Sequence, residues 1–515
     1  MTLPRPPGYL PITVADGVRS SALRTPDKVC LAHGAREITY RALVERIDRV
    51  SGAAVHGLGL RDGDHAAIMA TNCIEFVEVV LGLASVGIAT AMVNPRSTPE
   101  ELAFISDDSE ARALFVHPRT DEAARSAELA SVERIVTFGD EYERWLADSR
   151  PVGERPRPEE WDTFCIPYTA GTTGAPKGVL LPHRSRALTF FSMGIEYGCY
   201  GPRDRAYGVA PMFHGAGFAF SVAPIFFGGF CAIADAFEPE ALLRDLDELA
   251  ITNIFLVPTH FQGIFALGEE GLARHGYPAL RTIISNAAPL PQPMKERIVE
   301  YFGDGLLFEC YGSTEASIVC NLRPPDQLRK ERCVGQPFPC TEVRLLDEDG
   351  EEVGVDEVGE LHSRSPYLFN GYWKRPLDDA RALKDGWCTA GDLARRDEEG
   401  YLYIVDRKND KIISGGVNIY PREVEEALAR HPAVAEAAVY GVPDDYWGEA
   451  VRASVVLREG SRASAEELTA ACESVLARYK LPKRIEFAER LPRNAAGKVL
   501  RRELREAAAH DAAGA

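Results

Sequence analysis

The stretch AAIMATNCIEFVEVVLGLASVGIATAMV, residues 66–93, decides the fold class of this chain. Two short runs of small and apolar residues, 66–70 and 89–93, predict β-strands, and the apolar segment 74–84 between them is long enough for about three helical turns. Because parallel strands need a crossover connection, usually a helix, the stretch predicts a β-α-β unit. It does not predict a membrane span, since the apolar run 79–93 is shorter than the roughly 20 residues that a bilayer requires.

The same alternation of strands and helices continues to about residue 320. Thr98, Pro99 and the two glutamates after them predict a helix start, because a hydroxyl cap, a first-turn proline and carboxylates near the positive end of the helix dipole are typical there. Further strands are predicted at 113–116, 134–138, 163–169, 253–257, 282–285 and 306–311. Strands that alternate with helices indicate parallel sheets covered on both faces, so the predicted fold class is α/β.

Beyond about residue 335 the pattern changes to short alternating runs separated by turn residues, as in EVRLLDEDGEEVGVDEVGELHSR, residues 342–364. This pattern predicts a β-rich subdomain with hairpins at about 335–405. After residue 410 helices are expected near 421–429, 465–476 and 500–508, and strands near 434–440 and 450–457. We therefore expect a large N-terminal domain at 1–408, made of α/β layers plus the β-rich subdomain, and a small α+β C-terminal domain at 410–515.

The chain carries 58 Lys and Arg against 77 Asp and Glu, a net charge of −19. Such a protein repels nucleic acids and anionic membranes, because binding them requires an excess of basic side chains. Its eleven cysteines are scattered without the spacing of metal ligands, and the start MTLPRPPGYLP lacks the apolar core of a signal peptide. We expect a reduced, cytoplasmic protein with no nucleic-acid partner and no membrane span.

The strongest candidate for a binding site is YTAGTTGAPKG, residues 168–178, which follows a predicted strand. Its glycines let the backbone wrap an anion with N–H groups, its threonine hydroxyls add donors, and Lys177 adds a positive charge. The loop is not the P-loop of nucleoside triphosphatases, because that loop needs Ser or Thr after the lysine, whereas Gly178 follows Lys177. A surface loop without a ligand is the alternative, but the density of donors favours a phosphate site.

Three further motifs carry residue types that suit nucleotide binding. YGSTE, residues 311–315, ends another predicted strand, where α/β proteins bind ligands, and it offers a ring for a base, a hydroxyl for phosphate and a carboxylate for Mg²⁺. Asp392 suits the two hydroxyls of a ribose, and Arg407 follows near enough to fix it. Lys498 lies in the loop NAAGK. Each motif alone is more typical of a polar turn or, for Lys498, of a solvated surface lysine.

The motifs gain meaning from their order along the chain. Seven segments follow one another: YTAGTTGAPKGV, APMFHGAGF, SNAAPLP, ECYGSTEAS, GWCTAGDL, DRKNDKIISGGVNIYPREVE and LPRNAAGKVLRREL. From about residue 35 to 505, this order resembles the adenylate-forming superfamily of acyl-CoA synthetases, luciferases and peptide-synthetase adenylation domains, most of all a bacterial-type acyl-CoA synthetase. The resemblance implies an ATP-dependent acyl-CoA ligase. Such an enzyme activates a carboxylic acid as an acyl-adenylate with release of pyrophosphate, then passes the acyl group to the thiol of coenzyme A.

The resemblance also implies a role for each candidate residue that binds a cofactor. The β- and γ-phosphates of ATP would bind the loop that contains Thr169, Gly171, Thr172, Thr173, Gly174 and Lys177. Thr314 would contact the α-phosphate, Glu315 would ligate Mg²⁺, and Tyr311 would stack on adenine, with Ala287 and Ala288 in the same cofactor site. Asp392 would bind the ribose with support from Arg407. Lys498 would lie between the acyl carboxylate and the α-phosphate as the catalytic lysine.

By the same resemblance the C-terminal domain is mobile, with its hinge at Asn409, and the segment with Gly415 and Gly416 lines a tunnel for the pantetheine arm of CoA. Asn409 departs from the family, which usually has Asp or Lys there.

The substrate pocket would include His214, Phe218, Asn286 and Gly312, with His214 near the acyl carboxylate or in a structural role. Asn286 is a second departure, because many relatives carry glycine. Its amide is expected to narrow the pocket or to bind a polar substituent.

Several alternatives stay open at this point. The enzyme could load a carrier protein instead of CoA, or retain only one half-reaction; a non-enzymatic nucleotide-binding protein is disfavoured, because the phosphate loop, Glu315, Asp392 and Lys498 are all present. Fatty, aryl and polycyclic acids all stay open as substrates, and a homodimer stays open as an assembly. The segment 478–505 is rich in Lys and Arg, and we expect it to contact the phosphates of ATP or CoA.

Overall fold

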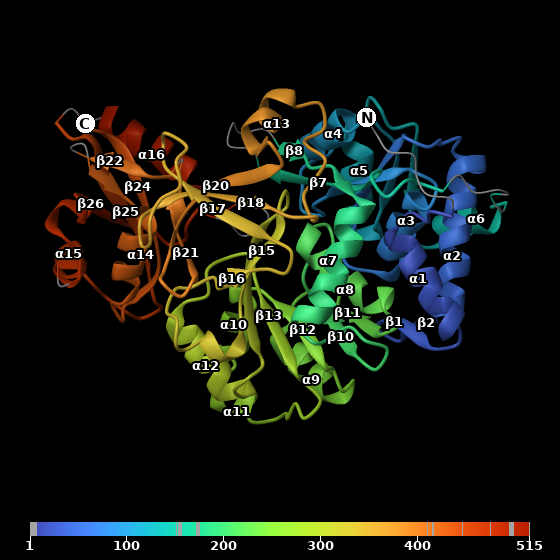
Figure 1. Ribbon diagram of the computed structural model, residues 1–515, viewed down its shortest axis with the longest axis horizontal. Coiled ribbons are helices and arrows are strands. Elements are labelled where there is room, and N and C mark those ends of the chain that lie inside the picture. The colour runs from blue at the N-terminus through green and yellow to red at the C-terminus, as the bar shows by residue number, and fades with distance from the viewer. Residues whose placement is uncertain are drawn as a thin grey trace. The chain divides into compact units, whose positions relative to one another are not determined.

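The computed structural model, drawn in Figure 1, describes residues 8–150, 152, 157–170, 176–408, 410–414, 417–444, 446–473, 475–493 and 499–513. The chain divides into two compact units. The first consists of Met1–Val343 and Ser363–Ala390, and the second of Arg344–His362 and Gly391–Ala515. Each unit has an apolar core of its own.

The first unit contains a nine-stranded sheet with the order β16-β15-β14-β13-β12-β10-β11-β1-β2. The strands are β1 (Val29–His33), β2 (Arg36–Thr39), β10 (Arg205–Gly208), β11 (Phe230–Ile233), β12 (Asn253–Leu256), β13 (Thr282–Ser285), β14 (Leu307–Ser313), β15 (Ser317–Leu322) and β16 (Gln336–Pro337). The inner strands pair in parallel, as predicted. The edges differ from the prediction: β2 and β15 pair antiparallel, because the connections to β1 and β14 are too short for a parallel crossover.

A second sheet of the first unit has seven strands in the order β6-β5-β3-β4-β7-β8, with β9 also paired to β7. The strands are β3 (His65–Met69), β4 (Ala89–Val93), β5 (Ala111–Val116), β6 (Arg134–Thr137), β7 (Thr163–Ala170), β8 (Pro176–Gly178) and β9 (Leu181–Pro182). Strands β3 to β7 pair in parallel, and β8 turns back antiparallel along β7. The β-α-β unit predicted at residues 66–93 is thereby confirmed.

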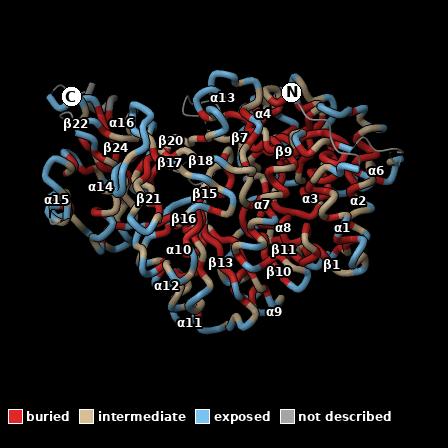
Figure 2. The backbone as a smooth tube through the Cα atoms, viewed as in Figure 1, coloured by how far each residue is buried: buried red, intermediate tan, exposed pale blue. Residues whose placement is uncertain are grey.

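Helix α3 (Ile74–Ala84) explains why that stretch decides the fold. All of its residues except Glu75 are buried, and it packs against β4 and β7 of one sheet and β1 of the other. Its buried acid, Glu78, binds Arg46 and the hydroxyl of Tyr142. A helix that is apolar all round has to be covered on every side. It therefore forms part of a layer between the two sheets, in the region that Figure 2 colours as buried.

The other helices of the first unit pack against the two sheets and against one another. They are α1 (Val14–Arg24), α2 (Tyr40–Gly52), α4 (Pro99–Asp108), α5 (Asp121–Ser126), α6 (Asp140–Ala147), α7 (His183–Glu196), α8 (Gly215–Phe226), α9 (Pro239–Glu248), α10 (Pro258–Phe265), α11 (Gly268–Leu272), α12 (Gln292–Phe302) and α13 (Pro376–Ala382). The helix start predicted at Thr98 is confirmed. The Thr98 hydroxyl accepts from the Glu101 N–H at 3.3 Å, and the Glu101 carboxylate accepts from the Thr98 N–H at 2.9 Å.

The β-rich segment forms a five-stranded sheet with the order β17-β18-β20-β19, in which β21 also pairs with β20. Its strands are β17 (Glu342–Leu346), β18 (Gly359–Arg364), β19 (Leu383–Lys384), β20 (Trp387–Arg396) and β21 (Leu402–Arg407). The antiparallel pairing of β20 with β19 and β21 confirms the predicted hairpins.

The C-terminal part of the second unit is a sheet with the order β23-β22-β25-β24, in which β26 also pairs with β25. Its elements are β22 (Ile412–Ser414), β23 (Val417–Ile419), α14 (Pro421–Ala429), β24 (Val434–Asp444), β25 (Gly448–Leu457), α15 (Ala465–Glu473), β26 (Arg484–Phe487) and α16 (Arg501–Ala513). Strand β24 runs beyond its predicted end at residue 440, because it pairs with β25 along its whole length.

The domain boundary predicted at residue 408 and the hinge at Asn409 stay predictions. Asn409 lies outside the described residues, and a division into compact units does not report which of them move. Over the part of the chain that the structure describes, no helix combines the length and apolarity needed to cross a membrane.

Candidate functional site

The predicted phosphate loop is held at its two ends by strands. Thr169 near the end of β7 lies opposite Lys177 of β8, so the chain reverses direction between them. The hydroxyl of Tyr168 donates to Asp108 at 2.8 Å, which fixes the end of β7 to helix α4. Residues Gly171, Thr172, Thr173 and Gly174 lie outside the described residues, so their role stays a prediction.

Lys177 is buried and forms an ion pair with a residue that the sequence analysis did not single out. Its ammonium lies 2.7 Å from the carboxylate of Asp378, in the first turn of α13, and 5.5 Å from the centre of the Tyr372 ring. Asp378 and Tyr372 belong to the segment FNGYWKRPLDD, residues 369–379, which runs beside β8. Val179 forms a β-bridge with Tyr372, and the Trp373 N–H donates to Gly178 at 2.8 Å.

Glu315, the predicted magnesium ligand, is fixed by the same segment. The Tyr372 hydroxyl donates to the Glu315 carboxylate at 2.8 Å, and the Phe369 N–H donates to the Glu315 carbonyl at 2.9 Å. Burial, and then the charge of Glu315, raise the pKa of Tyr372, so its hydroxyl stays protonated and available as a donor. The structure thus gathers Lys177, Glu315, Tyr372 and Asp378 in the first unit.

We expect Tyr372→Phe to raise the Mg²⁺ concentration needed for half-maximal activity about tenfold. The change removes the hydroxyl that orients Glu315, and a hydrogen bond to a charged group contributes about 1.5–3 kcal/mol. The measurement is the Mg²⁺ dependence of pyrophosphate release at saturating ATP. Tyr277→Phe is the matched control, because it removes a tyrosine hydroxyl that bonds Tyr301 at 2.8 Å in another part of the unit. An unchanged Mg²⁺ dependence would contradict the role of Tyr372.

The turn after β14 has little freedom. A Cβ at Gly312 would lie 1.9 Å from the Ser317 carbonyl oxygen, so that only glycine fits there. The Ser313 hydroxyl accepts from the Ala316 N–H at 3.0 Å and closes the turn that contains Thr314. Tyr311, Thr314 and Glu315 are therefore presented from a rigid turn at the end of the sheet.

The loop between β13 and α12 is anchored to β14 at two points. The Asn286 amide donates to the Cys310 sulfur at 3.1 Å, and the Leu290 N–H donates to the Glu309 carboxylate at 3.3 Å. Glu309 itself forms a buried ion pair with Lys295 of α12. Between the anchors, Ala287 and Ala288 are exposed, and Ala287 has a φ of 77°, a conformation that favours glycine. The amide donor of Asn286 is thus already engaged within the protein.

We expect Asn286→Gly to shift the ratio of kcat/KM values between small and bulky acids in favour of bulky ones by severalfold, because it removes the side chain from the predicted pocket wall. The measurement is a substrate profile with CoA and ATP saturating. Cys310→Ala is the control, since it removes the hydrogen-bond partner but keeps the bulk of Asn286. If Cys310→Ala shifts the profile equally, the bonded orientation of Asn286 matters instead of its size.

The remaining pocket candidates lie at helix α8. His214 is the residue before its first turn and is exposed at the surface. The protein around it nevertheless displaces much of the bulk water near the ring, which lowers the pKa of the imidazole and keeps it neutral near pH 7. A neutral imidazole can accept one hydrogen bond and donate another. Phe218, one turn later, is buried, and its ring centre lies 6.1 Å from that of Phe76 and 5.8 Å from that of Phe164.

In the second unit the structure brings Asp392 and Arg407 together. They lie opposite each other on β20 and β21, and the Arg407 guanidinium is 3.2 Å from the Asp392 carboxylate. Asp392 is buried, whereas the arginine is more exposed. The geometry agrees with the predicted support of an acid by an arginine.

The predicted catalytic lysine and the glycines predicted to line a tunnel fall outside the described residues. These are Lys498, Gly415 and Gly416, and their roles stay predictions. The residues that flank the lysine loop are anchored: Arg493 and Val499 form a β-bridge, and the Leu500 N–H donates to Pro492 at 2.8 Å. Likewise, Ser414 pairs with Val417 across the end of the β22-β23 hairpin.

Helix α16, which begins three positions after Lys498, is bound to the residue beside the predicted hinge. Arg501 and Arg505 each lie 3.2 Å from a carboxylate oxygen of Asp410. Arg501 also binds Glu425 at 2.6 Å and the Val439 carbonyl at 3.1 Å. The position next to Asn409 and the start of α16 are thus firmly joined within the second unit.

The basic segment 478–505 is less positive than its composition indicates. Most of its described cations are paired with acids: Lys480 with Glu423, Arg484 with Glu486, Arg493 with Glu436, Arg501 and Arg505 with Asp410, and Arg502 with Glu506. Lys483 instead lies 5.0 Å from the centre of the Trp447 ring. Contact of this segment with phosphates stays a prediction, and Lys483 is its best described candidate.

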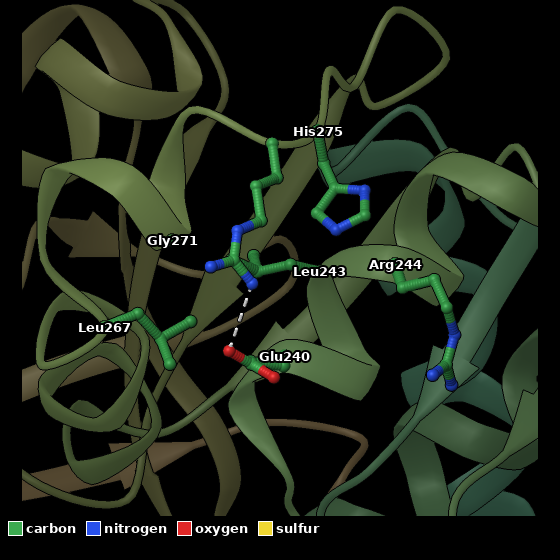
Figure 3. A pocket seen from close by; sticks show the side chains of 7 residues that line it. Glu240, Leu243, Arg244, Leu267, Gly271 and His275 are labelled. Carbon is green, nitrogen blue, oxygen red and sulfur yellow. Dashed lines mark hydrogen bonds and ion pairs between the residues drawn. The ribbon is translucent and has the colours of Figure 1, made fainter.

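A pocket of about 150 Å³ lies elsewhere in the first unit, between α9 and α11. Figure 3 shows Glu240, Arg244, Leu267 and His275 around it, with an ion pair from Arg274 to Glu240. None of the residues predicted to bind ATP, CoA or the acid lines this pocket.

Family models match most of the chain. One described as AMP-binding enzyme matches residues 18–373, and one described as AMP-binding enzyme C-terminal domain matches residues 423–498.

Similar proteins cover nearly the whole chain. It is 36% identical over 488 residues to a feruloyl-CoA synthase of Amycolatopsis sp, a match that covers 94% of this chain and 96% of that protein. It is 32% identical over 543 residues to a long-chain-fatty-acid–CoA ligase of Bacillus subtilis (strain 168), covering 97% and 96%. The solved structure of o-succinylbenzoate CoA synthetase from Bacillus subtilis with its acyl-adenylate has a TM-score of 0.85 and 28% identity, covering 96% and 98%.

Proposed function

Since the chain belongs to the family of AMP-binding enzymes and is an acyl-CoA ligase of the AMP-forming type, we propose that its acid substrate is an aromatic carboxylic acid. ATP and CoA are its other substrates. The proposal for the residues rests above all on one observation, the cluster of Lys177, Tyr372 and Glu315 beside the phosphate loop.

The first half-reaction joins two anions, the carboxylate of the acid and the α-phosphate of ATP. The loop from Thr169 to Lys177 binds the β- and γ-phosphates through backbone N–H groups, hydroxyls and one ammonium. Thr314 binds the α-phosphate with its hydroxyl. Tyr311 stacks on adenine beside Ala287 and Ala288. These residues hold the α-phosphate in place for attack by the carboxylate.

Glu315 is the residue that fits Mg²⁺. Its carboxylate is an oxygen donor, the ligand type that Mg²⁺ prefers, and the Tyr372 hydroxyl fixes its orientation. When bound, the ion would neutralise the negative charge that develops on the pyrophosphate as it leaves the α-phosphate. The role of Glu315 is to hold the positive charge of the ion near the leaving pyrophosphate.

Asp392 binds the ribose hydroxyls, and Arg407 orients its carboxylate. Lys498 places an ammonium between the acyl carboxylate and the α-phosphate and so stabilises the transition state electrostatically. For this the C-terminal domain closes for adenylation. A later rotation about Asn409 to a second pose then lets the Gly415-Gly416 segment receive the pantetheine arm. His214 lies near the acyl carboxylate as a neutral donor.

Two sets of relatives bear on the acid. The feruloyl-CoA synthase and the o-succinylbenzoate CoA synthetase are named for acids that contain an aromatic ring, which favours an aromatic acid here. The long-chain-fatty-acid–CoA ligase favours a fatty acid as the second candidate.

The test is pyrophosphate release and thioester formation with cinnamic acids, benzoic acids, polycyclic acids and fatty acids of several lengths. A higher kcat/KM for an aromatic acid supports the proposal, and a preference for fatty acids overturns it.

We also propose that CoA is the acceptor in preference to a carrier protein, that the enzyme is cytoplasmic and that it forms a homodimer. The eleven cysteines are free thiols, which fits a reducing compartment. Incubation of the purified enzyme with acid, ATP and either CoA or a panel of carrier proteins separates the acceptors, since a carrier-protein ligase leaves CoA unacylated. Light scattering gives the molar mass in solution, and a monomeric value overturns the dimer.

A further inference from the structure

We propose that Asp378 is a built-in counter-ion of Lys177 that has to release the lysine when ATP binds, and that Asp378 thereby sets the affinity of the enzyme for ATP. The inference rests on the proposed function, because it takes Lys177 as a ligand of the ATP phosphates. It assigns a role to a residue outside all the motifs that the sequence pointed to.

The first observation is the pair itself. The Lys177 ammonium lies 2.7 Å from the Asp378 carboxylate, and the two side chains are only 10% and 19% exposed. A lysine so far removed from water needs a negative partner, because an unpaired buried charge is strongly unfavourable. Among the described residues, Asp378 is the acid within ion-pair distance of Lys177. Without nucleotide, the lysine is thus neutralised by the protein.

The second observation is that the neighbouring acids are committed elsewhere. Glu315 accepts from the Tyr372 hydroxyl at 2.8 Å, and Asp379 accepts from the Tyr372 N–H at 2.6 Å. The Lys177 ammonium lies over the Tyr372 ring, 5.5 Å from its centre, but a ring is no substitute for a full negative charge. A phosphate that binds Lys177 therefore competes with the carboxylate of Asp378 and not with those of Glu315 or Asp379.

The third observation is that Asp378 has a second cation within reach. Arg381, three residues later on α13, has its guanidinium 3.9 Å from the same carboxylate oxygen, and its side chain is 75% exposed. When a phosphate oxygen takes Lys177, Asp378 can close on Arg381 without leaving its helix. The exchange lets the lysine change partners without leaving a buried charge unpaired.

The carboxylate of Asp378 nevertheless opposes nucleotide binding. It holds the lysine that the phosphates need, and it places a negative charge beside a polyanion in a site with little water. Replacing it by the neutral, nearly isosteric asparagine removes both effects. We expect Asp378→Asn to lower the Kd for Mg·ATP about five- to tenfold, the size of a partly buried ion-pair contribution.

The experiment measures the Kd for Mg·ATP by calorimetry on the full-length enzyme without acid, and the KM values for ATP and the acid in the complete reaction. Asp378→Asn should tighten ATP binding and leave the KM for the acid unchanged. In a Lys177→Met background the same change should have a smaller effect, at most about twofold, because the competition is gone and only the repulsion between the Asp378 carboxylate and the phosphates remains. Glu110→Gln is the matched control: it neutralises one acid of an exposed lysine pair, with Lys374 at 2.6 Å, in the same unit.

A Kd that is unchanged or weaker in Asp378→Asn overturns the inference; a weaker Kd would mean that Asp378 orients Lys177 for the phosphates. If Glu110→Gln tightens Mg·ATP binding equally, the effect comes from net charge alone, and the inference is overturned as well. If the wild-type enzyme neither binds ATP nor releases pyrophosphate with any acid, the proposed function fails instead. Melting temperatures of the variants verify that each is folded.

Discussion

Replacing Lys498 with alanine lowers the rate of acyl-adenylate formation by about two to three orders of magnitude, the loss expected when one electrostatic donor to a developing charge is removed. Thioester formation from a supplied acyl-adenylate is expected to keep most of its rate. The difference arises because only the first half-reaction brings the acyl carboxylate and the α-phosphate together. Pyrophosphate exchange reports the first step, and mass spectrometry of the acyl-CoA product reports the second.

Arg502→Ala is the control for Lys498→Ala. Arg502 is a nearby cation of α16 that is 68% exposed and paired with Glu506, so its loss changes the local charge by the same amount without affecting the proposed site. It should leave both half-reactions near the wild-type rate. An equal loss of both steps in Lys498→Ala would reject the assignment, and so would an equal loss of adenylation in Arg502→Ala.

Gly416→Leu is expected to lower thioester formation by at least about a hundredfold while acyl-adenylate formation stays within about twofold, as for a bulky side chain placed in a narrow passage. The reason is steric: Gly416 follows Ser414 and Gly415 at the end of β22, in the segment that the resemblance places along the path of the pantetheine arm. The measurement is acyl-CoA formation from a purified acyl-adenylate at several CoA concentrations.

Gly416→Ala separates a blocked passage from a strained turn. Both substitutions add a Cβ between the paired residues Ser414 and Val417, but only leucine adds bulk beyond it. Alanine should therefore retain most of the thioester-forming rate. If alanine and leucine are equally inactive, backbone strain explains the loss and the tunnel assignment falls.

Features that depend on neighbours in sequence were predictable. Helices α3 and α14 begin and end at the predicted residues, because apolar patterning and, in α14, a first-turn proline act within a few positions. The pairing of Asp392 with Arg407 was predictable for a similar reason: they lie on strands joined by a short turn, which brings them opposite each other. Such features need no knowledge of the remote parts of the chain.

The contacts around Glu315 were not predictable in this way. Tyr372 lies 57 positions from Glu315, and nothing in the local pattern of NGYWKRP shows that its hydroxyl returns to that carboxylate. The ion pair of Lys177 with Asp378 likewise joins β8 to a helix far along the chain. Sequence patterns identified one partner of each pair by its chemistry, while the other partner depends on the tertiary fold.

The composition of the segment 478–505 also overestimated its uncompensated positive charge. Counting Lys and Arg between residues 478 and 505 ignores acids that lie on other elements, such as Glu423 of α14 and Glu436 of β24. Because those acids are distant in sequence, only the folded unit shows that most of the charge is already compensated. A cation such as Lys483, which contacts an aromatic ring instead of an acid, is a better guide to a phosphate partner.

The double contact of Arg501 and Arg505 with Asp410 has a consequence for how rates respond to mutation. Two arginines on one carboxylate make the link redundant, so a rotation about the predicted hinge would move the residue beside position 409 and the helix that follows Lys498 together. A substitution at position 409 should then slow or speed both half-reactions in proportion. A substitution within 494–498 should change the first alone. The ratio of the two rates, more than either rate, therefore distinguishes a defect in transmitted motion from a defect in chemistry.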